Sequence, residues 1–155
     1  MPISTAQKTF PCYRNEKGDV IFSEEDIPSC AKKVERKGVY RLCFKGIVDE
    51  EAFQCSYTNK IDRGITMRPR ELKRPTCFAT SCFSKKNDAL VKRSAWISNN
   101  PLLVIAVGNI TVDSGVSCTD HELNNDDNYS HINWWIYREY NASNDFSKCE
   151  EGIAI

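Results

Sequence analysis

This chain of 155 residues has no net charge, no long apolar run and few histidines. Its 21 Lys and Arg balance 21 Asp and Glu, so the whole molecule has no general attraction to nucleic acid or anionic lipid. The longest apolar run, residues 101–108, is far too short to cross a membrane. The first ten residues lack the apolar centre of a signal peptide, and we interpret the chain as a mature form without its leader. We predict no membrane association and no nucleic-acid partner.

Histidine is scarce, and this scarcity bears on catalysis. Cleavage of RNA needs two placed acid–base groups and a cation for the phosphate, but the only histidines, His121 and His131, both come late in the chain. Residues 11–27, PCYRNEKGDVIFSEEDI, are similar to a stretch of the fungal guanyl-specific ribonucleases, yet the histidine that those enzymes place before their catalytic Glu and Arg has no counterpart here. No G-x-S-x-G motif is present. We predict no catalytic activity, with a secreted ribonuclease-like protein or toxin as the alternative.

Metal-binding patterns are also missing. None of the cysteines forms a C-x-x-C pair, so the two close ligand pairs of a structural zinc site are absent. An acidic stretch that begins at Asp120 has Asn125 where a calcium loop needs Gly and His131 where it needs Glu. We expect neither a metal nor a cofactor.

Cysteine, in contrast, is abundant. An even number of scattered cysteines in a small chain favours disulfides and an oxidising compartment, so we predict four intrachain disulfides of open connectivity. The eight residues are Cys12, Cys30, Cys43, Cys55, Cys77, Cys82, Cys118 and Cys149. Three N-x-[ST] sequons, at Asn109, Asn128 and Asn141, are candidate glycosylation sites that agree with secretion.

The patterns of apolar residues predict a mixed fold. Residues 23–38 show an N-cap at Ser23, acids first and bases last, and an apolar stripe that ends before Gly38, all typical of a helix. A second helix is predicted near residues 87–97, and strands at 39–48, 102–112 and 131–140. We predict one α+β domain over residues 1–155, with an antiparallel β-sheet of about four strands, packed with two or three helices and stabilised by disulfides.

Two charged stretches are predicted as loops. Residues 113–130 are acidic and rich in Asp and Asn. Residues 58–76 contain six basic side chains, and we interpret them as a solvated loop, with contact to phosphate groups or an acidic protein as the functional alternative. Arg68 and Arg70 of this stretch are our candidates for contacts to a partner.

The stretch HINWWIYREY, residues 131–140, places two tryptophans side by side in a predicted strand. Neighbouring side chains of a strand point to opposite faces, so Trp134 and Trp135 cannot serve the same surface. Trp134 suits an apolar layer. Trp135 and Tyr137 belong to the other face, for which we favour burial under a second layer over contact with a partner.

One resemblance follows from this strand. Trp135-Ile136-Tyr137-Arg138 is similar to the W-R-[FY]-[RK] motif of the LARS group, the small cysteine-rich avirulence effectors of plant-pathogenic fungi, with Ile136 in place of the motif's Arg. The resemblance implies an α+β fold held by disulfides, and secretion into the apoplast or translocation into host cells. It also implies virulence activity, binding of a host protein and recognition by plant immune receptors. Trp135, Tyr137 and Arg138 would then belong to the partner-binding set of a monomer.

Overall fold

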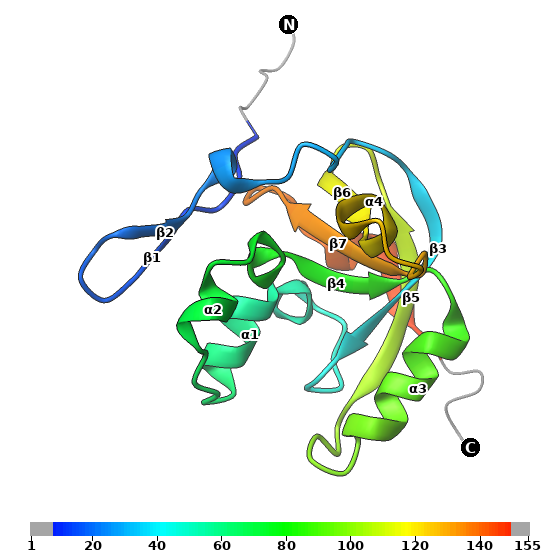
Figure 1. Cartoon of the computed structure of the whole chain (residues 1–155). Coiled ribbons are helices and arrows are strands. Elements are labelled where there is room, and N and C mark those ends of the chain that lie inside the picture. Colours follow the sequence, from blue (N-terminus) through cyan, green and yellow to red (C-terminus); the bar gives the residue numbers. More distant parts are fainter. Residues whose placement is uncertain (1–7, 150–155) are drawn as a thin grey trace, which may run out of the picture.

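Figure 1 shows the computed structural model, in which residues 8–149 are described. Its main element is an antiparallel sheet of six strands. From one edge to the other the strands are β6 (Gly115–Thr119), β7 (His131–Ile136), β4 (Thr80–Phe83), β3 (Arg36–Cys43), β5 (Val104–Ile110) and β8 (Phe146–Lys148). A separate hairpin is formed by β1 (Tyr13–Arg14) and β2 (Val20–Phe22), and it extends away from the sheet in Figure 1.

Short helices surround this sheet. The α-helices are α1 (Ser56–Asp62), α2 (Pro69–Leu72), α3 (Lys86–Trp96) and α4 (Asp120–Asn124). The 3-10 helices are η1 (Glu24–Asp26), η2 (Glu50–Phe53), η3 (Pro75–Phe78) and η4 (Ala142–Asp145). The predicted α+β class is therefore confirmed, with a larger sheet than expected. In the part of the chain that the structure describes, no helix has the length and apolar character needed to cross a bilayer.

The strand predicted at residues 102–112 is confirmed as β5, which lies inside the sheet between β3 and β8. Ile105 and Ala106 are both fully buried and belong to two different core clusters. Because adjacent strand residues face opposite ways, β5 is covered on both sides, as its continuous apolar run predicted. One of these clusters contains Ala89 of α3, the helix that the sequence predicted near residues 87–97.

The two tryptophans of β7 lie in different layers of the core. Trp134 is 1% exposed and packs with Phe53 and Phe146, whereas Trp135 is 2% exposed and packs with Phe22 and Phe78. Each indole N–H has a partner, since Trp134 donates to the Ser114 hydroxyl at 3.1 Å and Trp135 to the Pro75 carbonyl at 3.2 Å. The preference for burial of Trp135 is thus confirmed, and its side chain is not offered to a partner.

The predicted helix at residues 23–38 is wrong. The N-cap contact does form, because Asp26 accepts a hydrogen bond from the Ser23 backbone, but only η1 follows it. Pro28 has no N–H to donate and pushes the residue before it toward extended geometry, and Ile27 indeed has ψ 129. The chain then makes a turn, in which the Ala31 N–H donates to the Pro28 carbonyl at 3.0 Å, before it reaches β3. Gly38, expected to end a helix, lies in β3 with φ +69, at a shift of the β3–β5 register.

The two predicted loops are also wrong in part. Residues 58–76 contain most of α1, all of α2 and the start of η3, whereas residues 113–130 contain β6 and α4. These elements have four to seven residues each. The helices among them span about two turns or fewer, too few to show a helical period, so the charge pattern dominated the prediction.

The sequence predicted four disulfides, and the described structure contains none among the cysteines from Cys12 to Cys118. The seven cysteines from Cys12 to Cys118 are thiols. Cys43 and Cys82 are fully buried, and burial raises the pKa of the Cys43 thiol to about 11 and that of Cys82 to about 12. A thiol with such a pKa stays protonated and unreactive near neutral pH. The predicted four disulfides remain a prediction.

Candidate binding groove

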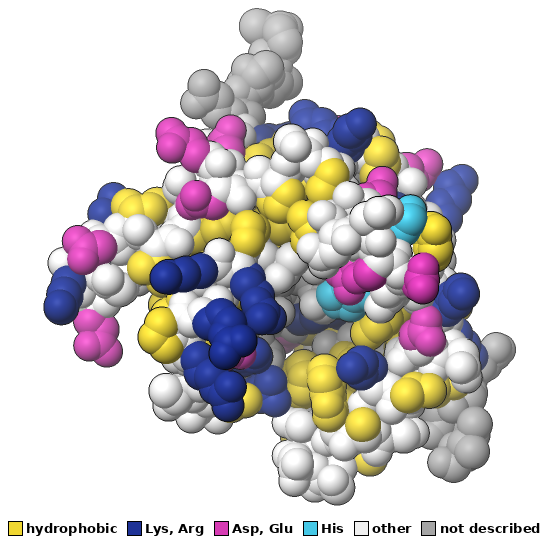
Figure 2. Space-filling view, viewed as in Figure 1, with side chains coloured by type: hydrophobic (Ala, Val, Ile, Leu, Met, Phe, Trp, Pro, Cys, Tyr) yellow, Lys and Arg dark blue, Asp and Glu magenta, His cyan; other side chains and the backbone are white. Residues whose placement is uncertain are grey.

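Two adjoining cavities form one groove across the face of the molecule shown in Figure 2. The larger has a volume of about 560 Å³ and the smaller about 330 Å³, and both fall in the range of roughly 300–1,000 Å³ that is usual for ligand sites. The cavities are continuous because five residues line both of them. These shared residues are Ser56, Lys60, Ser81, Asp120 and His131.

Strand pairing builds the floor of the groove. His131 and Asn133 are two residues apart on β7 and therefore share a face. Ser81 of β4 is the Cα partner of Asn133, which brings β4 into the same floor. Helices α1 and α4 stand on either side, and α3 carries the lining residues Lys92 and Trp96 at one end.

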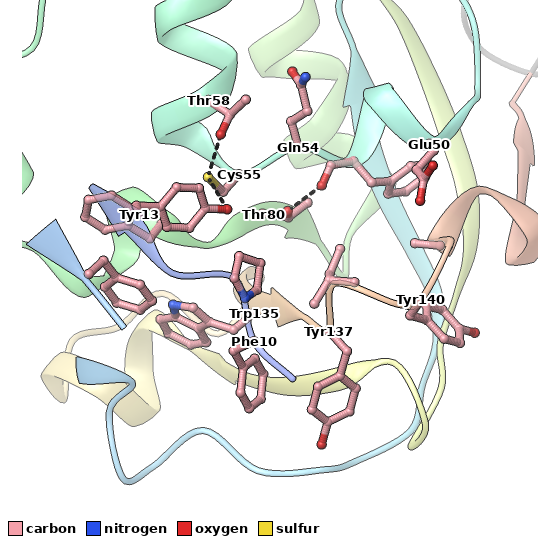
Figure 3. Close-up of a pocket in the computed structure, with 16 residues that line it drawn as sticks. Phe10, Tyr13, Glu50, Gln54, Cys55, Thr58, Thr80, Trp135, Tyr137 and Tyr140 are labelled. Atoms are coloured by element: carbon pink, nitrogen blue, oxygen red, sulfur yellow. Dashed lines mark hydrogen bonds between the residues drawn. The ribbon is translucent and has the colours of Figure 1, made fainter. Parts of the chain in front are cut away.

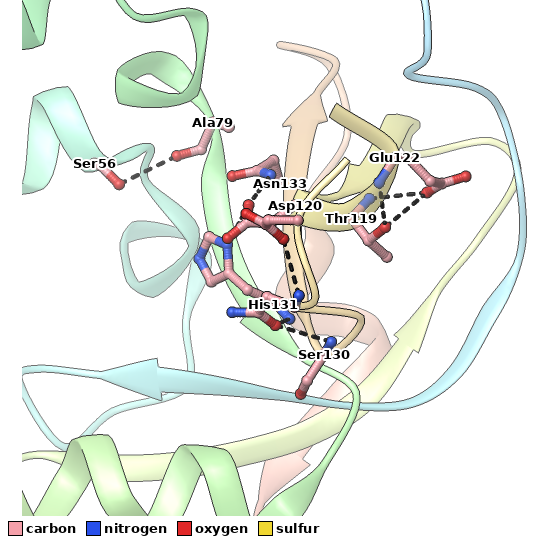
Figure 4. A network of polar contacts seen from close by, with 10 residues as sticks. Ser56, Ala79, Thr119, Asp120, Glu122, Ser130, His131 and Asn133 are labelled. Carbon is pink, nitrogen blue, oxygen red and sulfur yellow. Dashed lines mark hydrogen bonds and ion pairs between the residues drawn. The ribbon is translucent and has the colours of Figure 1, made fainter. Parts of the chain in front are cut away.

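A carboxylate and an imidazole meet in the centre of this groove (Figure 4). His131 Nδ1 lies 2.9 Å from Asp120 Oδ1, and the Asn133 amide donates to the same oxygen at 2.8 Å. A proton on Nδ1 directed at the carboxylate leaves Nε2 of the neutral ring as a hydrogen-bond acceptor. Asp120 is fixed in turn, because the reciprocal cap between Thr119 and Glu122 holds the start of α4.

Basic side chains border the groove. We call Lys60, Arg63, Arg74 and Lys92, which come from α1, the α2–η3 connection and α3, the groove cations. Figure 2 shows Lys and Arg gathered on one side of the hollow, with histidine and acidic side chains on the other. Glu71 is ion-paired with Lys60 at 3.2 Å, and hydrogen bonds from the Arg68 backbone and from Lys60 lower the pKa of this carboxyl. The four groove cations outnumber the two carboxylates in the lining, Glu71 and Asp120, which leaves a local excess of positive charge.

One end of the groove is aromatic. Trp96, at the end of α3, is 40% exposed and stacks on Phe44, with 5.8 Å between ring centroids and 24° between ring planes. The Arg63 guanidinium lies 4.3 Å from the centre of the Phe44 ring, and the Lys92 ammonium lies 5.5 Å from that of Trp96. Both rings line the smaller cavity. The other two tryptophans are buried, so Trp96 is the exposed member of the three.

Arg41 supports the groove from inside. Its side chain lies in the lining of the smaller cavity but is only 6% exposed as a residue. The guanidinium donates hydrogen bonds to the carbonyls of Ala52, Gln54 and Ser81 at 2.8 to 3.1 Å. It therefore ties η2 and the start of α1 to β4, and its charge is engaged inside the protein.

The strand motif that carried the family resemblance lies elsewhere. Trp135 and Tyr137 line a separate cavity of about 170 Å³ together with Tyr13 and Cys55 (Figure 3). Tyr137 is 7% exposed. Arg138 is exposed and donates to the Thr9 hydroxyl at 3.2 Å. None of the three lines the groove, so the structure does not bring them together with the basic segment.

The other sequence candidates fall at varied positions. Arg68 and Arg70 are exposed at α2 beside the groove, without lining it. The sequon residues Asn109 and Asn141 lie outside the groove, whereas Asn128 lines its smaller cavity. The Asn128 side chain accepts hydrogen bonds from the backbone of Ser130 and His131, at 3.0 and 2.9 Å.

Sequence reasoning missed the aromatic end and the central pair as parts of one site. Lys60, Arg63 and Arg74 belonged to the stretch predicted as a solvated loop, and Asp120 to the acidic loop. The one signal for Trp96 was a tryptophan near the end of a charged helix, too little to place it beside Phe44. Among residues 8–149, no cluster of three or more His, Cys, Asp or Glu side chains is suited to hold a metal ion.

Comparisons with known proteins identify no relative. No family model, no curated protein and no solved structure matches this chain. A function has to be argued from the groove and from the sequence patterns.

Proposed function

We propose that this chain is a secreted, non-catalytic effector that acts by binding a negatively charged host molecule in the groove. The observation that carries the proposal is the position of the groove cations around one continuous hollow. Net charge is zero for the whole chain, so a local excess of this kind reflects placement and not composition. Charged clefts concentrate ligands of opposite sign and guide their approach.

Binding without catalysis is favoured by the groups that line the groove. His131 with Asp120 supplies one group that can accept a proton. Glu71 is the other carboxyl in the lining, and its lowered pKa keeps it ionised at neutral pH, so it has no proton to donate. General acid–base cleavage needs both partners in place.

The secreted and pathogenic setting comes from the sequence. Eight cysteines, three sequons and the resemblance of residues 135–138 to the LARS motif support an effector of a plant-pathogenic fungus, recognised by plant immune receptors. Because Trp135 and Tyr137 are core residues, we propose that they stabilise the fold and that the partner is bound by the groove instead.

Binding of two labelled polyanions, polyglutamate and oligouridine, tests the proposal by fluorescence anisotropy. The variant Lys60→Gln/Arg74→Gln removes two groove cations, and Lys17→Gln/Lys37→Gln removes two exposed charges outside the groove. We expect the groove variant to weaken binding about tenfold and the control variant to change it little, because surface charges away from a contact contribute weakly. Equal losses in both variants, or no binding of either polyanion, would refute the groove as the binding site.

A ribonuclease-like activity is the second candidate, favoured by the His131–Asp120 pair in a basic groove. Incubation of purified protein with RNA separates the two functions. Turnover that disappears in His131→Gln without a change in the melting curve would make the chain an enzyme. Intact RNA after prolonged incubation with the wild type agrees with binding alone.

A further inference from the structure

The groove joins an exposed aromatic surface to a row of cations, and this combination is narrower than a general attraction for anions. Trp96 and Phe44 form a stacked pair at the end that also carries Arg63 and Lys92. Lys60 lies where the two cavities meet, and Arg74 lines the larger one. A ligand that fills the groove therefore meets an aromatic ring, then a polar centre, and then a further cation.

We infer, as a refinement that rests on the proposed function, that the ligand of this groove is single-stranded RNA. Proteins that bind single strands combine a positive groove for the backbone with aromatic rings on which bases stack. Trp96 is 40% exposed and lines the smaller cavity, which has a volume of about 330 Å³. The groove cations supply the contacts to the phosphates.

The centre of the groove favours RNA over an acidic peptide. Asp120 and the Nε2 atom of His131 present hydrogen-bond acceptors at the point where the cavities meet. The Asp120 carboxylate repels a peptide carboxylate and a phosphate alike, so the centre of the groove suits a neutral hydrogen-bond donor that lies between anionic groups. The ribose 2′-hydroxyl and the N3–H of uracil are such donors, and the 2′-hydroxyl is absent from DNA.

The zero net charge argued against nucleic acid as a partner. A single strand of a few nucleotides, however, meets only the field of the groove, where the groove cations outnumber the lining carboxylates.

Tryptophan fluorescence and anisotropy with short oligouridine RNA test the inference. Because Trp134 and Trp135 are buried, quenching on addition of RNA reports on Trp96. We expect quenching in the wild type and its loss in Trp96→Phe, which keeps an aromatic ring and binds RNA within about threefold of the wild type. Trp96→Ala should weaken binding roughly tenfold, as the loss of one stacked base does.

The outcomes separate this inference from the proposed function. Binding of polyglutamate but not of RNA, with sensitivity to Lys60→Gln/Arg74→Gln, would overturn RNA as the ligand and leave the anionic groove in place. Equal affinity for oligouridine and for oligodeoxyuridine, which lacks only the 2′-hydroxyl, would overturn the preference for ribose. RNA binding that leaves the fluorescence unchanged, or that is the same in Trp96→Ala, would overturn stacking at Trp96. Failure of every polyanion to bind would remove both assignments.

Discussion

At the scale of single residues, Arg41 makes the most concentrated set of contacts. Its buried guanidinium donates to three backbone carbonyls from two separate segments. Truncation would leave these acceptors without partners in the interior, and an unsatisfied buried group costs about 1–3 kcal/mol. We therefore expect Arg41→Ala to lower the free energy of unfolding in urea by about 3 kcal/mol or more. Arg70→Ala, at an exposed position, should change it by less than about 0.5 kcal/mol. Similar effects of the two substitutions would contradict the role given to Arg41.

The cysteines allow a second prediction at this scale. Burial, and after it the neighbouring Cys30 side chain, raises the pKa of the Cys118 thiol to about 12, so the two side chains lie close together. The backbones are held together there, because Lys32 pairs with Ser117. If the protein matures in an oxidising compartment, we expect Cys30–Cys118 to be a disulfide, detected by peptide mapping without reduction. Alkylation of both residues in the denatured, non-reduced protein would rule this pair out.

At the scale of elements, β7 determines the layering of the core. Trp134 and Trp135 fill two different clusters on the two faces of this strand. We expect Trp134→Ala and Trp135→Ala each to destabilise the protein by about 3–5 kcal/mol in thermal or urea melts, the cost of truncating a large core side chain. If Trp135→Ala left the stability unchanged and weakened partner binding, Trp135 would be a partner contact and not a core residue.

The cap of α4 links stability to pH. Hydrogen bonds from Thr119 and the charge of Arg36 lower the pKa of Glu122 below its ordinary value of 4.5. A carboxyl with a lowered folded-state pKa stabilises the fold above its unfolded-state pKa and loses that contribution as pH falls through the folded-state pKa. Glu122→Gln should therefore be less stable than the wild type at pH 7, by at most about 1 kcal/mol for an exposed cap. The difference should shrink as the pH falls below 4.5 and vanish below the lowered folded-state pKa, and a difference that stays constant as the pH falls would exclude this linkage.

The sequence was sufficient for the elements that apolar side chains mark clearly. The strand around Ile105 has a continuous apolar run, and the strand with Trp134 and Trp135 places large apolar side chains on both faces. The failures have local causes. Pro28 stopped a helix whose cap was correctly recognised, and elements of four to seven residues were hidden in charged stretches.

At the scale of the whole molecule, the groove depends on contacts between segments far apart in the chain. Phe44 meets Trp96, and the helix that follows β6 brings Asp120 to His131 of β7. Such proximity comes from sheet order and loop packing, which no spacing in the sequence encodes. The basic character of residues 58–76 was visible in advance, but the surface that these residues border was not.

The central claim is that the groove is the binding site, and NMR of isotope-labelled protein titrated with short oligouridine tests it most directly. We expect shift changes to concentrate at the residues shared by the two cavities and at the Trp96 indole, while the β1–β2 hairpin stays unchanged. The same titration of Lys60→Gln/Arg74→Gln should give smaller changes at equal RNA concentration. Shift changes centred on the hairpin or around Arg138, or none at saturating concentrations of both oligouridine and polyglutamate, would contradict the claim.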